Sequence, residues 1–114
     1  KKYFKLYEPE FRRNFVHLSD VVRAFIFSLE NYEKFKNNIF NLGLNNANIT
    51  KEELCKLIQK QIPEFVYEIS KDEKDPDKRD YFVSNEKLKK FGFEAEFSLD
   101  RGIKELISYY NKYN

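Results

Sequence analysis

The fold is decided by residues 12–25, which read Arg-Arg-Asn-Phe-Val-His-Leu-Ser-Asp-Val-Val-Arg-Ala-Phe. The short alternation of apolar and polar residues at 15–18 predicts a strand. Ser19 and Asp20 follow at once, and such residues before an apolar run are typical of a helix N-cap. The stretch therefore predicts a strand that begins with two arginines and leads directly into a capped helix.

The helix that follows is expected over residues 20–31 and leaves almost no polar face. Its apolar members are Val21, Val22, Ala24, Phe25, Ile26, Phe27 and Leu29. A helix that is apolar all round is buried on several sides. We therefore expect this helix to pack against a partner sheet or domain that these 114 residues do not supply.

Turn and cap signals predict the other elements. Thr50 and Glu53 form a capping box, and Pro63 ends the helix that they open. The remaining expectations are a strand at 3–7 in a hairpin with 15–18, strands at 38–44 and 65–69, a charged loop at 70–80, a helix from Ser84 to Gly92, and a final helix capped by Ser98. This alternation of strands and helices favours an α/β fold with some parallel pairing.

Composition limits the class of protein. Hydrophobic residues make up 41% and charged residues 35% of the chain, which predicts a folded protein. The 21 cations and 19 anions leave a net charge of +2, which argues against binding to nucleic acid or a membrane surface. Cys55 is the only cysteine, so no internal disulfide can form and the cytoplasm is the expected compartment. No apolar run reaches transmembrane length.

Residues 13–21 resemble the Arg-Asp-Phe/Tyr-Ile/Val-His-Val-x-Asp-Val segment of extended short-chain dehydrogenases/reductases, the NAD(P)-dependent nucleotide-sugar epimerases and dehydratases. Four further landmarks follow in the order of that family: residues 40–43, the helix at 51–60, residues 90–93, and residues 98–103. The resemblance covers essentially the whole chain. It implies an α/β, C-terminal fragment of a Rossmann-type enzyme, with the substrate-binding region and the last strand of the cofactor sheet.

The resemblance also implies that part of the enzyme is missing. The family carries a glycine-rich dinucleotide fingerprint in its N-terminal half, whereas Gly43, Gly92 and Gly102 are the only glycines here and do not cluster. Residues 1–114 are therefore expected to be the C-terminal substrate-binding portion, without the dinucleotide-binding domain. NAD or NADP is implied for the full-length enzyme, and this chain alone is expected to bind neither.

Four residues are candidates for substrate binding. Arg13 resembles the family's arginine that holds the nucleotide-sugar diphosphate, and a guanidinium suits bidentate bonds to phosphate oxygens. Lys74 and Asp77 occupy the places of the family's Arg-x-Gly-Asp loop, which implies a phosphate contact and a ribose contact. Pro76 replaces the glycine, and Arg79 is an alternative cation. The competing interpretation is a solvated charged loop.

Other polar residues favour structural roles. Arg12 should point away from Arg13 on a strand and be solvated. His17 is the only histidine and is expected to pack and hydrogen-bond, Asp20 to cap a helix, and Cys55 to act as a small apolar residue. The Tyr32–Lys36 spacing matches the family's catalytic Tyr-x-x-x-Lys, but two common residues at one spacing carry little information. No catalytic residue and no metal site are therefore expected.

The sequence thus predicts the nucleotide-sugar-binding part of an NAD(P)-dependent epimerase, dehydratase or reductase, inactive alone, in the biosynthesis of heptose or deoxysugars for surface polysaccharides. Its expected partners are a nucleoside-diphosphate sugar and the missing or separate cofactor domain. The alternative is a free-standing binding or interaction module that complements such a domain or associates with itself. A small independent enzyme would rest only on Tyr32, Lys36 and His17.

Overall fold

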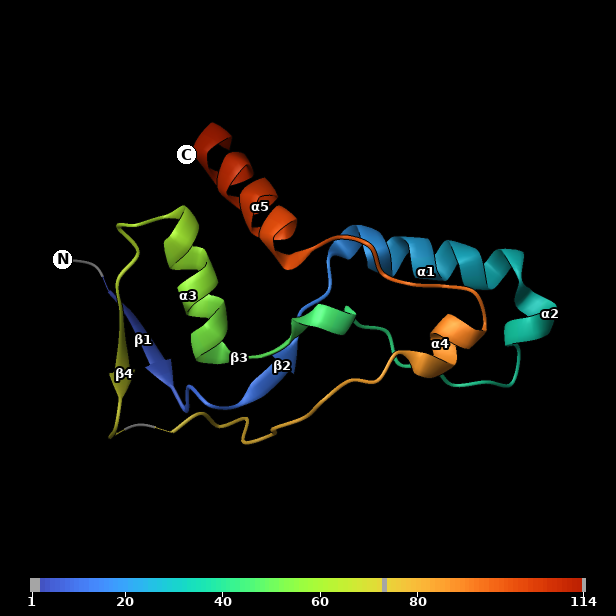
Figure 1. Cartoon of the computed structure of the whole chain (residues 1–114), viewed down its shortest axis with the longest axis horizontal. Coiled ribbons are helices and arrows are strands. Elements are labelled where there is room, and N and C mark those ends of the chain that lie inside the picture. The colour runs from blue at the N-terminus through green and yellow to red at the C-terminus, as the bar shows by residue number, and fades with distance from the viewer. Residues whose placement is uncertain (1–2, 73, 114) are drawn as a thin grey trace.

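The computed structural model describes residues 3–72 and 74–113, an elongated body with extents of 54 × 34 × 19 Å (Figure 1). Along the chain the elements are β1 (Phe4–Tyr7), β2 (Arg12–Asn14), α1 (Leu18–Glu30), α2 (Tyr32–Phe35), a 3₁₀ turn (Asn45–Ala47), β3 (Asn48–Thr50), α3 (Lys51–Gln61), β4 (Tyr67–Ser70), α4 (Glu86–Lys90) and α5 (Leu99–Tyr113). The strands β1 and β4 with α3 and α5 form one end, and α1, α2 and α4 form the other. Residue 73 of the expected charged loop lies outside the described residues.

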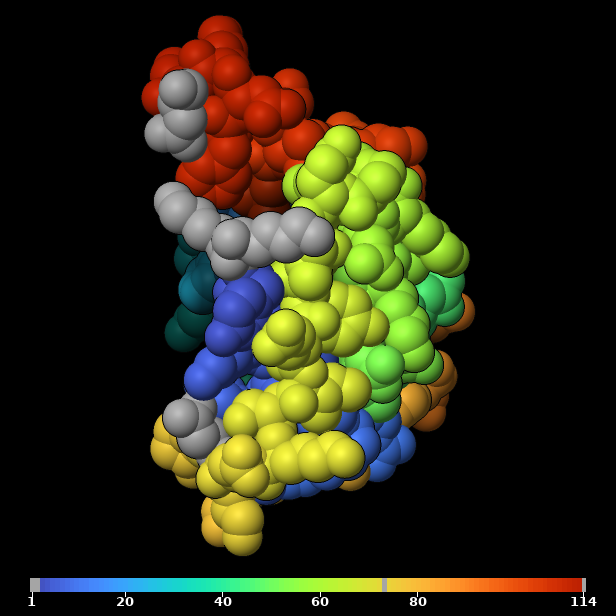
Figure 2. Space-filling model, turned by 90° about the vertical axis from the view of Figure 1, so that its left-hand side faces the viewer, coloured from blue at the N-terminus to red at the C-terminus, as the bar shows by residue number. Residues whose placement is uncertain are grey.

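The strands form two small sheets. β1 pairs in parallel with β4, with Phe4 opposite Tyr67, and these segments lie side by side in Figure 2. β2 pairs antiparallel with β3, with Arg12 opposite Thr50. The expected parallel pairing is confirmed, whereas the hairpin between residues 3–7 and 15–18 is wrong. The segment between β1 and β2 is held instead by the first amides of α3, because the N–H groups of residues 51 and 52 donate to the carbonyls of residues 11 and 9 at 3.1 Å.

The junction of β2 and α1 differs from the sequence prediction. The strand covers residues 12–14 rather than 15–18, and α1 begins at Leu18. His17 is the N-cap, because its Nδ1 accepts the Ser19 amide at 3.0 Å. Ser19 and Asp20 therefore lie inside the first turn, and the prediction that they cap the helix is wrong. An imidazole nitrogen supplies the acceptor that a hydroxyl or carboxylate usually provides.

Most other helix signals are confirmed. The capping box at the start of α3 is complete, since Glu53 donates its amide to Thr50 Oγ1 and accepts the Thr50 amide at 2.7 Å. α5 starts after Ser98, whose Oγ accepts the Arg101 amide. Gly92 closes α4 with a positive φ of 103°. The prediction of Ser84 as an N-cap is wrong, because α4 begins at residue 86 after Asn85.

The strand expected at residues 38–44 does not form. In the described part of the chain no strand lies beside this segment, so its backbone has no ladder to join. Its side chains instead enter the core, where Phe40 and Leu42 pack against Phe35, Leu88 and Phe93.

A buried carboxylate holds the 93–97 segment on α1. The Asp20 side chain is fully buried and accepts the amides of Glu96 and Phe97 at 3.1 and 2.9 Å. It also accepts Arg23 Nη1 at 2.6 Å, and the same guanidinium reaches Glu96. Asp20 therefore satisfies two backbone donors of a segment that belongs to neither sheet.

One face of α1 is uncovered. Its exposed apolar residues recur at helical spacing along the outer side, and they are Leu18, Val22, Phe25, Ile26 and Leu29 at 50–74% exposure. The opposite side, with Asp20, Ala24 and Phe27, faces the rest of the protein. The helix is thus apolar in two directions, as expected, and only one of them is satisfied here. None of the helices formed by residues 3–72 and 74–113 has the length and apolar character needed to cross a membrane.

Candidate functional site

Arg13 is turned into the charged loop. Its side chain is only 14% exposed, and Nη2 donates to the Asp77 carbonyl at 3.1 Å and lies 3.4 Å from the Asp77 carboxylate. Nη1 donates to the carbonyls of Arg12 and Arg79. The guanidinium carbon lies 5.3 Å from the centre of the Tyr81 ring, which covers one of its faces. β2 thus delivers a cation to the inner side of the loop.

Arg12 points outward from the same strand. Its Nε and Nη2 donate to the two oxygens of Asp80 at 3.1 and 3.2 Å, and Asp80 also accepts the Arg12 amide. Both side chains are more than 40% exposed. Arg12 is thus largely solvated, as expected, but it also fixes the end of the loop rather than standing free.

The middle of the loop is a closed ion pair. Asp77 accepts Arg79 Nε and Nη2 in a bidentate arrangement, each at 2.7 Å, together with the Arg79 amide at 3.2 Å. Because these hydrogen bonds favour the carboxylate, they hold the pKa of Asp77 far below its usual range, and the Arg13 charge adds to the effect. Asp77 is therefore ionised at all physiological pH values.

The start of the loop is tied to α3. Lys51 Nζ donates to Asp75 at 2.7 Å in a largely buried pair, and that bond lowers the pKa of the Asp75 carboxyl. The Asp75 amide donates to Glu8. Lys74, by contrast, is exposed and makes no hydrogen bond or ion pair with residues 3–72 or 75–113.

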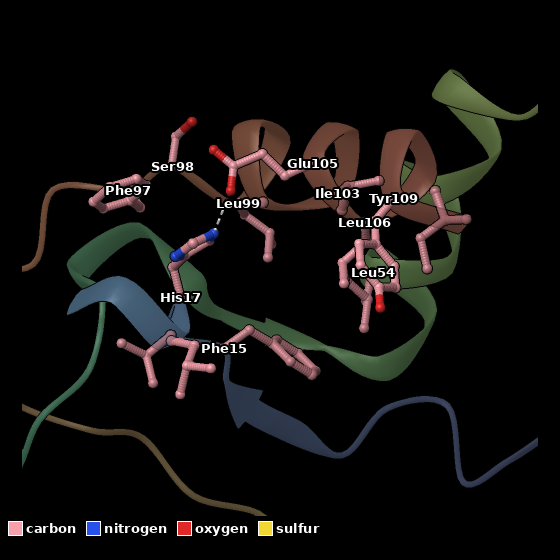
Figure 3. Close-up of a pocket in the computed structure, with 14 residues that line it drawn as sticks. Phe15, His17, Leu54, Phe97, Ser98, Leu99, Ile103, Glu105, Leu106 and Tyr109 are labelled. Atoms are coloured by element: carbon pink, nitrogen blue, oxygen red, sulfur yellow. Dashed lines mark hydrogen bonds and ion pairs between the residues drawn. The ribbon is translucent and has the colours of Figure 1, made fainter. Parts of the chain in front are cut away.

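A hollow lies between α3, α5 and the segment before α1. It is an apolar pocket of about 620 Å³. Most of its lining is hydrophobic, contributed by Phe15, Leu54, Ile58, Leu99, Ile103, Leu106 and Tyr109 (Figure 3). Its polar members sit at one side, where His17 faces Glu105. Such a lining suits an apolar side-chain face rather than a phosphate.

His17, the N-cap of α1, connects α1 to α5 at the rim of this pocket. Its ring stacks on Phe97 with centroids 4.5 Å apart, and Nε2 lies 2.8 Å from Glu105 Oε2. Because Nδ1 accepts the Ser19 amide, the neutral ring carries its proton on Nε2 and donates it to Glu105. The expectation that His17 packs and hydrogen-bonds is confirmed.

Glu105 should make stability depend on pH. The hydrogen bond from His17 and the bond from Arg101 lower the pKa of Glu105 below its ordinary value of 4.5. The carboxylate therefore stabilises the fold above pH 4.5, and this contribution is lost as the pH falls through the lower folded-state pKa. We expect Glu105→Gln to melt at a lower temperature than the wild type at pH 7, with the difference shrinking as the pH falls below 4.5. A difference that persists at acid pH would contradict this account.

Comparison with solved structures shows which proteins share this fold. No protein-family model matches the chain. The UDP-glucose 4-epimerase of Thermotoga maritima, solved with UDP-glucose, is 26% identical with a TM-score of 0.76, over 98% of this chain and 36% of its own. This chain has the fold of the C-terminal portion of an extended short-chain dehydrogenase/reductase.

Two enzymes of Campylobacter jejuni share that fold. A GDP-6-OMe-4-keto-L-xylo-heptose reductase is 18% identical with a TM-score of 0.83, over 96% of this chain and 34% of its own. A GDP-D-glycero-L-gluco-heptose synthase, solved in the presence of NADPH, is 18% identical with a TM-score of 0.73, over 94% and 32%. The chain thus spans about a third of the length of these extended short-chain dehydrogenase/reductase structures.

Of the four predicted binding residues, the structure brings three together. Arg13, Asp77 and Arg79 form one contact network, whereas Lys74 is exposed and lies outside it. The resemblance to extended short-chain dehydrogenases/reductases is therefore confirmed at the level of the fold, and the roles of these residues stay predictions.

Sequence reasoning missed a clamp that fixes β2. Asn14 Nδ2 donates to the Leu44 carbonyl and Oδ1 accepts the Leu44 amide, both at 2.9 Å. The carboxamide of Asn14 thus bonds both backbone groups of Leu44, as a residue of a neighbouring strand would. A Cβ on Gly43 would lie 2.5 Å from Asn14 Oδ1, so the glycine leaves space for the clamp. The Asn-Leu-Gly motif was predicted as a strand end, and nothing in it indicates a partner 30 residues away.

The remaining candidates are structural in the described residues. Tyr32 and Lys36 lie at the two ends of α2, and Lys36 pairs with Glu33. Cys55 is buried in α3, and burial raises the pKa of its thiol, as expected for a small apolar residue. Among residues 3–72 and 74–113 no cluster of histidine, cysteine or acidic side chains could hold a metal ion.

Proposed function

We propose that this chain is the nucleotide-sugar-binding portion of an NAD(P)-dependent epimerase, dehydratase or reductase, and that it is catalytically inactive alone. Within that class, biosynthesis of heptose or deoxysugars for surface polysaccharides is the role that we favour. The observation that carries the proposal is the meeting of Arg13 and Arg79 with Asp77 at one side of β2, in a fold shared with a UDP-glucose 4-epimerase.

The chemistry of this cluster fits a sugar diphosphate. Two guanidinium groups can each give paired, charge-assisted hydrogen bonds to phosphate oxygens. An ionised Asp77 can accept hydrogen bonds from ribose hydroxyl groups, and Lys74 offers a further point charge from the exposed start of the loop. Arg13, Lys74, Asp77 and Arg79 are therefore the proposed substrate-binding residues.

A cofactor domain is proposed to complete the enzyme. Three observations support it: the chain spans about a third of its structural neighbours, its three glycines form no dinucleotide fingerprint, and the outer face of α1 is uncovered. NAD or NADP would bind that domain and supply the redox chemistry. The mass of the protein in its native source tests this part: about three times 13.9 kDa is expected, and a native mass near 13.9 kDa without a separately encoded cofactor domain would contradict it.

Binding of UDP-glucose and of a GDP-sugar to the chain tests the assigned residues. We expect Arg13→Ala to weaken the affinity about tenfold, because a charge-assisted hydrogen bond contributes on the order of 1.5 kcal/mol. Arg12→Ala removes the same charge from the neighbouring position and should change the affinity much less. Equal losses for both variants would show a general charge effect and contradict the role of Arg13, as would the failure of the wild-type chain to bind either sugar at millimolar concentration.

The alternative function is a free-standing module that complements a separate cofactor domain or associates with itself. The exposed stripe on α1 favours it specifically, because an apolar face of this kind marks an interaction surface. Light scattering separates the cases. A wild-type dimer that dissociates when Phe25 is replaced by Glu supports self-association, whereas a wild-type protein that is already a monomer contradicts it.

A further inference from the structure

The charged loop covers the arginine that should meet the phosphates. The Arg13 guanidinium donates hydrogen bonds to the carbonyls of Arg12, Asp77 and Arg79, and the side chain is only 14% exposed. A diphosphate cannot reach the guanidinium while residues 77–79 hold these positions. Binding at Arg13 therefore requires this part of the loop to move.

The Asp77 carboxylate stands where an anionic ligand would stand. It lies between two guanidinium groups, 2.7 Å from Arg79 and 3.4 Å from Arg13. Arginine recognises carboxylates and phosphates with the same forked geometry. Asp77 thus satisfies the cations that a phosphate group needs, and it does so from within the chain.

The two ends of the loop are anchored separately. At one end Asp75 is bound to Lys51 in a largely buried ion pair, and its amide donates to Glu8. At the other end Asp80 is bound by Arg12 through both of its oxygens. The anchors at Asp75 and Asp80 can stay in place while residues 77–79 move, once the Asp77 amide leaves Asp75 Oδ1, which it meets at 2.8 Å.

We propose that Asp77 is an internal competitor of the phosphate ligand, and that residues 77–79 form a strap whose carbonyls and Asp77 carboxylate a diphosphate must displace from the guanidinium groups of Arg13 and Arg79. The inference rests on the proposed function. The closed strap keeps the two arginines from binding other small anions, and only a ligand with more negative charge than one carboxylate displaces it. A diphosphate meets that condition, whereas a single carboxylate or chloride does not.

Inorganic pyrophosphate is the probe that tests the strap, because it has no ribose for Asp77 to bind. We expect Asp77→Asn to bind pyrophosphate about fivefold more tightly than the wild type, since exposed ion pairs each change an equilibrium by a factor of a few. Glu33→Gln removes one negative charge at the distant, exposed pair with Lys36 and should leave the affinity unchanged. Thermal melting of all three proteins checks that they fold.

The outcomes separate the strap from the function it rests on. Equal or weaker pyrophosphate binding by a folded Asp77→Asn variant overturns the strap and leaves the phosphate site standing. Pyrophosphate binding by neither protein overturns both. If the variant fails to fold, an NMR titration of the wild type with pyrophosphate tests the strap. The signals of the Arg79 amide and Nε must shift. The signal of the Arg12 amide, which is bound to Asp80, must stay in place. Unchanged Arg79 signals at saturation overturn the strap.

Discussion

Replacing Asp20 by alanine is expected to lower the free energy of unfolding by about 3 kcal/mol, because it breaks a buried network at its centre. The carboxylate is fully buried and accepts the amides of Glu96 and Phe97, which would then have no partner. Arg23 would lose its 2.6 Å contact and keep exposed Glu96 as its ion-pair partner, together with its contact over the Phe93 ring. The loss should appear in urea unfolding as a lower midpoint.

Two matched variants define the cause. Glu96→Ala removes the exposed partner of the same arginine and should cost less than about 1 kcal/mol, as surface ion pairs do. Asp20→Asn retains one acceptor oxygen but presents an NH₂ group to a backbone donor, so its stability should fall between the wild type and Asp20→Ala. An alanine variant that loses less than about 1 kcal/mol would show that the backbone amides find other partners.

Replacing Gly43 by alanine is expected to cost about 2 kcal/mol, because overpacking at this position must displace Asn14. The new Cβ would lie 2.5 Å from Asn14 Oδ1 and 2.7 Å from its carboxamide carbon. Moving that side chain breaks both of its hydrogen bonds to Leu44. β2 would lose its connection to the 38–44 segment, and Arg13 would lose its fixed direction.

A double-mutant cycle tests this explanation. Once Asn14→Ala has removed the clamp, Gly43→Ala should cost almost nothing further, so the two losses are not additive. Gly102→Ala is the control, because its Cβ would meet only the edge of the His17 ring at 3.3 Å and alanine is the better helix former in α5. Additive losses in the cycle would show that the cost of Gly43→Ala does not come from displacing Asn14, and would contradict this explanation.

Local signals predicted the helices well and the strand pairing poorly. The box at Thr50 and Glu53 fixes the start of α3 through bonds across three residues, so it can be read directly from the sequence. The N-cap at His17 could not be predicted from the sequence, because aspartate is the residue type that usually caps a helix. Asp20 instead accepts a backbone amide 76 residues away. The 38–44 segment has the composition of a strand, but strand formation depends on a neighbour, which is absent from the described residues.

For the candidate site too, the sequence predicted some features and missed others. Resemblance to a family indicated Arg13, Lys74 and Asp77, with Arg79 as an alternative cation, and the fold brings Arg13, Asp77 and Arg79 together. It could not indicate that they bind one another, since an ion pair between residues 64 positions apart leaves no local pattern. The apolar pocket was missed for the same reason, because its lining comes from three separate segments.

NMR mapping of a nucleotide sugar on this chain tests the central claim most directly. The chain would be labelled with ¹⁵N and titrated with UDP-glucose, and the arginine side-chain signals followed together with the backbone amides. The account predicts shifts at Arg13 and at residues 74–79, including the Nε–H groups of Arg13 and Arg79, while the Arg12 amide bound to Asp80 stays in place. Shifts confined to the pocket between α3 and α5, or no shifts at saturating ligand, would contradict it.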